Sequence, residues 1–190
     1  MKKTGIFAAV LLSAISTVGV QAQDTAKKET PVKPAASPSQ AVLEAWNDIG
    51  RKLIAMAEDF PEDKYDFKAT PAQRSFAENL LHASGVNYFF TNVVRGEKPP
   101  ADEDPKREQY KTKADVVVFV KKAFADGAEA IKAKGDKGMS QLVVDPYAHR
   151  QTRISDFAYE FIEHNGEHYG QLVVYYRLSG LVPPESRPKK

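Results

Sequence analysis

The chain has 190 residues, of which 42% are hydrophobic, 10% aromatic and 27% charged, which fits one globular domain and is too short for two ordinary ones. It has no cysteine, which excludes disulfides, thiolate metal sites and a cysteine nucleophile. The formal net charge of +2 comes from Lys2 and Lys3, because basic and acidic residues are equal in number after the first 22 residues. Nucleic-acid binding requires a basic footprint, so we expect no nucleic-acid partner.

Residues 1–22 have the organisation of a secretory signal peptide. Two lysines precede an apolar run from Ile6 to Val20, and Val20-Gln21-Ala22 has the small-x-small pattern of a cleavage site. The alternative is an uncleaved membrane anchor, but this run of roughly 15 residues is shorter than the about 20 that a spanning helix needs. We therefore expect cleavage, a periplasmic or secreted protein, and no stable membrane insertion after cleavage.

Residues 23–39 are expected to form a disordered linker. They contain three prolines and several lysines, and they lack apolar residues able to bury surface. The folded domain is then expected over residues 40–188, and no internal repeat is visible in it.

The first two predicted helices have clear boundary signals. The first begins after Ser39, a candidate N-cap, and stops before Pro61. The second is expected to open at Thr70-Pro71-Ala72-Gln73, where Thr70 and Gln73 fit a capping box, and to end at Gly96. Apolar residues recur at helical spacing in both segments.

The third and fourth predicted helices follow a loop that is rich in proline and charge. The third starts at Thr112, with Asp115 in its first turn, and ends between Gly135 and Gly138. The fourth runs from near Thr152 to Ser179, and Gly180 is its C-terminal cap. Gly166 and Gly170 weaken this helix, and we expect them to allow a neighbouring backbone or ligand to approach closely. Four amphipathic helices without a convincing strand predict an all-α four-helix bundle.

Three of the four histidines are expected to face the bundle interior. His164 and His168 are four residues apart, which on a helix places both imidazoles on one face, with Cβ atoms about 5–6 Å apart. His82 lies in line with Val86 on the second helix. Two histidines from one helix and one from a facing helix can bind a divalent ion, with water or substrate in the open positions. The stretch is not a zinc-protease HExxH motif, because Asn165 occupies the glutamate position.

A purely structural role is the alternative for each of these rings, since a histidine on a helix face is more often a hydrogen-bonded or half-exposed side chain. An unpartnered polar group in the core costs about 1–3 kcal/mol, however, which favours a shared partner for inward-facing rings. His149, in the loop before the fourth helix, is expected to be solvated. Gln171, one turn beyond His168, can orient a ligand or a bound water, or form a surface hydrogen bond.

The C-terminal segment resembles the signature of the DinB-like family, whose last bundle helix carries an H-x3-H-x-G-Q pattern followed by an aromatic residue, an arginine, a glycine and prolines. Residues 164–184 read HNGEHYGQLVVYYRLSGLVPP. Residues 76–88 (FAENLLHASGVNY) are similar to the family's second helix with its metal histidine, and residues 61–71 resemble the link between its first two helices. The resemblance covers most of residues 39–188.

The resemblance implies a four-helix bundle with a three-histidine divalent metal site, carried by His82, His164 and His168. Zinc is the first expectation for the metal, with nickel, iron or manganese as alternatives. Relatives include thiol-dependent transferases and isomerases as well as metal-dependent hydrolases. The thiol cofactors of the transferases are intracellular, whereas this chain carries an export signal, which favours hydrolysis or simple binding.

Three hypotheses follow. In the first, the protein is a metal-dependent hydrolase or thiol-dependent transferase that acts on a small molecule of unknown identity. In the second, it is a non-catalytic module that binds a metal or a small molecule, and the two differ in whether an open coordination position faces a pocket with an acid or base. In the third, the bundle serves partner contacts and binds no metal. The sequence identifies no catalytic acid or base, and a homodimer is compatible with all three.

Overall fold

The computed structural model describes residues 34–101 and 104–188. The predicted signal peptide, residues 1–22, and residues 23–33 of the predicted linker lie outside the described residues. The main elements are, in chain order, α1 (Pro38–Asp59), α2 (Phe76–Arg95), α3 (Lys113–Met139), β1 (Leu142–Asp145), β2 (Arg150–Arg153) and α4 (Ile154–Leu178). Single 3₁₀ turns lie at Glu62–Lys64 (η1), Arg107–Gln109 (η2) and Pro184–Ser186 (η3).

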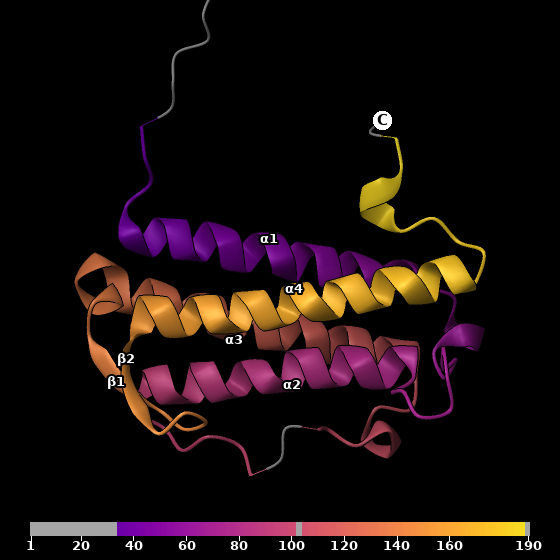
Figure 1. The fold of residues 1–190 in the computed structure, drawn as a ribbon, viewed down its shortest axis with the longest axis horizontal. Helices are drawn as coiled ribbons and strands as arrows, with labels where there is room; N and C mark the ends of the chain where they lie inside the picture. The colour runs from indigo at the N-terminus through magenta and orange to yellow at the C-terminus, as the bar shows by residue number, and fades with distance from the viewer. Residues whose placement is uncertain (1–33, 102–103, 189–190) are drawn as a thin grey trace, which may run out of the picture. The chain divides into compact units, whose positions relative to one another are not determined.

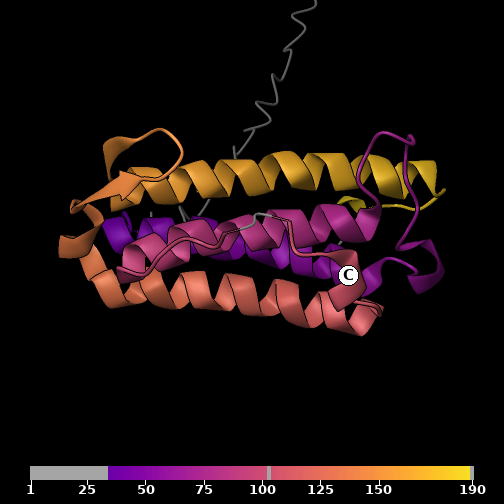
Figure 2. The same cartoon turned by 90° about the horizontal axis from the view of Figure 1, so that it is seen from below.

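The four long helices form a bundle in which α1 and α2 each pack against both α3 and α4 (Figure 1). Following the chain in Figure 1, α1 and α4 run in one direction, and α2 and α3 run in the other. The α2–α3 connection therefore travels back along α2 (Figure 2), and a hydrogen bond from Asn92 Nδ2 to the Lys98 carbonyl holds its first part there. This confirms the predicted all-α four-helix bundle.

The first helix begins slightly earlier than predicted. Its N-cap is Ser37 rather than Ser39, so the helix includes the last two residues assigned to the linker. The carboxylate of Asp136, near the end of α3, accepts hydrogen bonds from the hydroxyls of Ser37 and Ser39 and from the Ser39 amide, at 2.6–2.9 Å. A residue distant in sequence thus fixes this helix start.

The prediction that the second helix opens at Thr70 is wrong. The helix starts at Phe76, and its capping box is formed by Ser75 and Glu78, each side chain bonding the other's backbone amide. Phe76 is fully buried and stacks on Phe60 at a centroid distance of 3.8 Å. Burying this ring favours entry into the helix at Phe76 over the earlier capping sequence.

The boundaries of the last two helices largely agree with the prediction. Thr112 and Asp115 form the capping box of α3. Gly135, with φ of 57°, interrupts the helical backbone of α3, and a second helical piece follows it to Met139. Gly180, with φ of 73°, ends α4 in a Schellman motif, because its amide bonds the Arg177 carbonyl and the next amide bonds the Tyr176 carbonyl.

The expectation of no strand is wrong for the segment between α3 and α4. Strands β1 and β2 form an antiparallel hairpin in which Val143 pairs with Thr152. The strands have four residues each, which is too short to show a period-2 pattern in the sequence. Because β2 occupies residues 150–153, α4 starts at Ile154 rather than near Thr152.

The core is closely packed where α1 meets α3. The fully buried Trp46 donates its indole N–H to the Phe124 carbonyl at 2.9 Å. A Cβ added to Gly127 would lie 2.1 Å from the Trp46 ring, so only glycine fits there. By contrast, a Cβ on Gly166 or Gly170 would meet nothing within 4 Å, so the predicted close approach of a neighbouring backbone is wrong, and that of a ligand stays a prediction. No helix within the described ranges is long and apolar enough to cross a membrane.

Candidate metal centre

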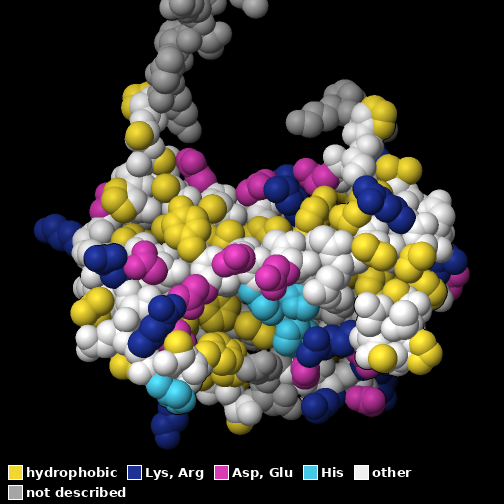
Figure 3. Space-filling view, viewed as in Figure 1, with side chains coloured by type: hydrophobic (Ala, Val, Ile, Leu, Met, Phe, Trp, Pro, Cys, Tyr) yellow, Lys and Arg dark blue, Asp and Glu magenta, His cyan; other side chains and the backbone are white. Residues whose placement is uncertain are grey.

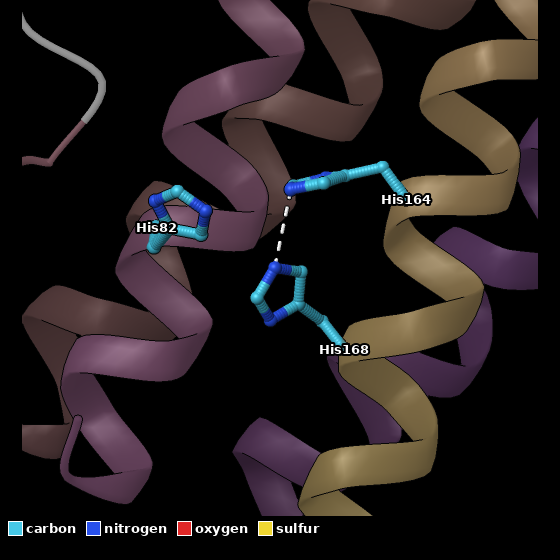
Figure 4. Close-up of side chains that lie close together, drawn as sticks. All are labelled: His82, His164 and His168. Carbon is cyan, nitrogen blue, oxygen red and sulfur yellow. Dashed lines mark hydrogen bonds between the residues drawn. The ribbon is translucent and has the colours of Figure 1, made fainter. Parts of the chain in front are cut away.

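The three inward-facing histidines meet between α2 and α4. His82 comes from the second turn of α2, and His164 and His168 come from successive turns of α4 (Figure 4). One ring nitrogen from each residue lies within 4.8 Å of the other two. The ring centroids are 4.5 to 5.3 Å apart. The structure therefore brings the sequence-predicted triad together.

The cluster lies at the boundary between core and solvent. His82 and His168 are buried, with 9% and 6% of their surface exposed, and His164 is half-buried. In the space-filling view, histidine side chains reach the surface in the gap between α4 and α2, next to hydrophobic side chains (Figure 3). An ion at this position would be shielded by protein on one side and accessible from the other.

His168 is held in a defined orientation by Asn79. Its Nδ1 lies 2.7 Å from Asn79 Oδ1, an oxygen that can only accept, so Nδ1 carries the proton and Nε2 presents a lone pair. Burial, together with the neighbouring His164 and His82, lowers the pKa of His168 to about 3. The ring is therefore neutral at physiological pH, as a metal ligand must be.

His82 is oriented in the same way by Asp104. Its Nδ1 lies 2.7 Å from a carboxylate oxygen of Asp104, and Arg74 donates to the same carboxylate at 3.2 Å. Partial burial acts to raise the pKa of Asp104, but the hydrogen bonds from Arg74 and His82 outweigh it and hold the pKa below its ordinary value. In many zinc sites the ring nitrogen that does not bind the metal donates a hydrogen bond to an ionised carboxylate, which fixes the orientation of the ring.

Gln171 acts through Asn79 rather than on a ring. Its Oε1 accepts from Asn79 Nδ2 at 3.1 Å, which fixes the amide so that Oδ1 faces His168. That Gln171 orients a ligand or a bound water stays a prediction, and its contact in the structure is this hydrogen bond with Asn79. His149, by contrast, is exposed in the β1–β2 turn, as predicted.

A pocket of about 220 Å³ adjoins the cluster. It is lined by His82, Val86, Tyr147, Glu160, Phe161 and His164. Glu160 is half-buried and accepts a hydrogen bond from Arg150 at 2.7 Å. A wider pocket of about 540 Å³ reaches Asn79 and Gln171 from another side, but no histidine lines it.

The donor set could hold a divalent metal ion. Two imidazole nitrogens on one tetrahedral zinc, at Zn–N distances of about 2.0–2.1 Å, are roughly 3.3 Å apart. The Nε2 atoms of His164 and His168 are 3.1 Å apart (Figure 4). Three neutral imidazoles leave the charge of the ion uncompensated and at least one coordination position open, so the arrangement could hold a metal and present it to the pocket.

Three contributors to the site were missed by the sequence analysis. Asn79 is three residues before His82 on the same helix face, and Glu160 is four residues before His164, so helical spacing could have identified both. Asp104 lies in the α2–α3 connection, where no periodicity places it, and only the crossing of that connection over α2 brings it to His82.

Comparison with known proteins agrees with this geometry. A family model described as the DinB superfamily matches residues 45–172. The chain belongs to the DinB superfamily. The matched range includes His82, His164, His168 and Gln171, and it confirms the family resemblance found in the sequence. A search of curated proteins gave no match.

Two solved structures of DinB-like proteins share the fold. A DinB-like protein from Bacillus cereus has a TM-score of 0.63 and 16% identity, covering 75% of this chain and 93% of its own. YfiT from Bacillus subtilis, described as a probable metal-dependent hydrolase with an unusual four-helix bundle topology, has a TM-score of 0.60 and 13% identity, covering 80% of this chain and 95% of its own. At these identities the likeness establishes the fold.

Proposed function

We propose that the protein is an exported metal-dependent hydrolase whose ion is held by His82, His164 and His168. The observation that carries this proposal is the convergence of three imidazole nitrogens within 4.8 Å beside a pocket. Zinc is the proposed ion, because a three-nitrogen set with an open position is typical of catalytic zinc sites. Nickel, iron and manganese are the alternatives, since imidazole also suits these metals.

A bound zinc ion supplies the chemistry by lowering the pKa of a coordinated water to about 7 and by polarising a substrate carbonyl. The protein residues prepare this site. Asn79 and Asp104 fix the two buried rings so that each directs one nitrogen toward the centre. Fixed ligands with fixed protonation states remove the cost of reorganising the site during reaction.

Glu160 is the proposed proton acceptor. It lies one helical turn before His164 and lines the same pocket as His164 and His82. A carboxylate in that position can accept a proton from an attacking water and return it to a leaving group. Arg150, which donates to Glu160 at 2.7 Å, holds the carboxylate toward the hairpin side of the pocket.

The pocket favours catalysis over the non-catalytic alternative. A structural metal site is closed by protein ligands, whereas a catalytic site keeps a position open toward solvent or substrate. Here two of the three histidines line the pocket, and a carboxylate lines it as well. Export favours hydrolysis over thiol transfer, because the thiol cofactors of the transferases are intracellular. Water, the second substrate of a hydrolase, is present outside the cytoplasm as well. The export proposal itself rests on the sequence of residues 1–22.

The proposal is tested by assaying the purified, zinc-loaded protein on a panel of small esters and amides, with and without added thiols. We expect turnover that chelation abolishes and zinc restores, that thiols do not increase, and that His164→Ala loses. His149→Asn is the matched control, because this histidine is exposed and outside the cluster. Turnover that survives in His164→Ala, or that requires a thiol, would contradict the hydrolase proposal.

A further inference from the structure

The pocket beside the three histidines has apolar walls that the metal site does not require. Val86 and Phe161 are buried, with 5% and 4% of their surface exposed, and Tyr147 contributes a third wall. Val86 is four residues after His82, and Phe161 is three residues before His164, so each lies on the same helix face as a histidine. The two helices therefore present ion ligands and apolar surface to the same space.

We infer that this pocket binds a single uncharged aromatic or branched aliphatic group of a small substrate, and that Tyr147 determines which group fits. The inference rests on the proposed function for the position of the reacting bond, which the histidines would hold at one side of the pocket. The apolar walls then take the substituent next to that bond.

The size of the pocket limits the substrate. Its volume of about 220 Å³ is below the roughly 300–1,000 Å³ of pockets that enclose drug-sized ligands. One ring or one branched chain fills such a space, whereas a polymer segment does not. Burying a group of this size provides a substantial apolar contribution to binding.

Tyr147 is held by a ring contact to α2 and by a backbone hydrogen bond within the hairpin turn. Its ring packs on Phe89 of α2 at a centroid distance of 5.1 Å. The buried carboxylate of Asp145 accepts from the amides of Tyr147 and Ala148, at 2.8 and 3.1 Å, which shapes the turn. These contacts restrict the position of the Tyr147 ring, so the ring limits the shape of the group that can enter the pocket. A specificity-determining residue requires such a fixed position.

The apolar walls of the pocket select against a charged substituent. Glu160 is the one carboxylate among the residues that line it, and Arg150 compensates it from the hairpin side. An anionic substituent among Val86, Phe161 and Tyr147 would lose its hydration and lie close to a like charge. A cationic substituent would also lose its hydration and would lie close to the proposed metal ion, whereas a neutral substituent meets none of these costs.

The test uses two metal-chelating probes that differ only in their substituent, acetohydroxamate and benzohydroxamate, titrated calorimetrically into the zinc-loaded protein. We expect benzohydroxamate to bind about tenfold more tightly, because its ring enters the apolar pocket. Tyr147→Ala should remove most of this preference and leave acetohydroxamate binding within about twofold. Tyr159→Ala is the matched control, because Tyr159 is 47% exposed, close to the 46% of Tyr147, and does not line the pocket.

A second arm works without metal and separates this inference from the proposed function. Benzyl alcohol, benzylamine and benzoate are titrated into the metal-free protein while the Val86 methyl resonances are followed by NMR. We expect the largest shifts with the alcohol, weaker shifts with the amine and with benzoate, and loss of all three in Tyr147→Ala. If zinc fails to bind but these shifts appear, the pocket inference stands while the hydrolase proposal fails. If hydroxamates bind the zinc-loaded protein equally well and Tyr147→Ala changes neither affinity, the pocket inference is overturned while the metal site stands.

Discussion

The carboxylate of Asp104 lies 2.7 Å from Nδ1 of His82, although the two residues belong to different elements. The contact exists because α2 and α3 run in the same direction, which forces the connection between them to return along α2 (Figure 2). The bundle topology thus places the Asp104 carboxylate beside His82, a histidine of the candidate metal centre. The same carboxylate is held by Arg74, which links the start of α2 to this connection.

Replacing Asp104 by asparagine is expected to weaken metal binding without abolishing it. The amide cannot provide the negative charge that orients and polarises the His82 ring, and losses of this kind typically cost about 10- to 100-fold in metal affinity. A competition titration with a zinc-chelating dye measures the change. The matched control is Asp66→Asn, because Asp66 pairs with Arg107 and is 70% exposed. Equal affinity in Asp104→Asn and the wild type would show that the contact does not support a ligand.

Asn79 and Gln171 are expected to differ in importance. Asn79→Ala removes the acceptor of the His168 Nδ1 proton, so we expect a loss of metal affinity of about 10-fold or more. Gln171→Ala leaves that acceptor in place and only frees the amide, so the loss should be a few-fold. The same dye titration compares the two variants. A larger loss in Gln171→Ala than in Asn79→Ala would mean that the order of these contacts is wrong.

The three histidines were predictable from the sequence. The residues that hydrogen-bond to their rings or line the adjacent pocket were only partly predictable. The spacing of His164 and His168 on one helix fixes their relative position, and the periodicity of α2 places His82 on the inner face. Asp104 could not be found this way, because its position depends on the path of a loop. Glu160 could have been identified from its position four residues before His164, which places it on the same helix face and beside the same pocket.

The same distinction holds for the fold. Long amphipathic segments determine the four helices, and glycine at positive φ determines the end of α4 at Gly180. The start of α2 was misplaced because Thr70 and Ser75 both precede acceptable capping sequences, and only the packing of Phe76 on Phe60 decides between them. The hairpin was missed because its strands are too short to show a pattern.

Two glycine substitutions are expected to change stability in opposite directions. Gly166→Ala should stabilise the protein by up to about 1 kcal/mol, because a Cβ there meets nothing within 4 Å and alanine is the better helix former. Gly127→Ala should destabilise it by about 1–3 kcal/mol, because its Cβ would lie 2.1 Å from a Trp46 ring that is buried and hydrogen-bonded. Chemical denaturation of the metal-free protein measures both, and the same sign for the two would contradict the packing described.

The metal-free protein is expected to lose stability in mild acid because of His168. The folded-state pKa of about 3 lies below the ordinary 6.5, so the unfolded chain takes up a proton below pH 6.5 while the folded ring stays neutral. Stability from this group is full above pH 6.5 and falls toward pH 3 by up to about 1.4 kcal/mol per pH unit. Denaturant titrations at about pH 7.5, 6 and 5, one above and two below the ordinary pKa of 6.5, measure how the free energy of unfolding changes with pH. This change should be smaller in His168→Ala than in the wild type. His149→Asn should keep the wild-type slope, and a wild-type slope in His168→Ala would count against this assignment.

We propose that three imidazoles jointly bind one metal ion. Elemental analysis of the purified protein beside His168→Ala and His149→Asn tests it most directly. We expect about one equivalent of metal in the wild type and in His149→Asn, and little in His168→Ala. The same metal content in all three proteins would contradict it.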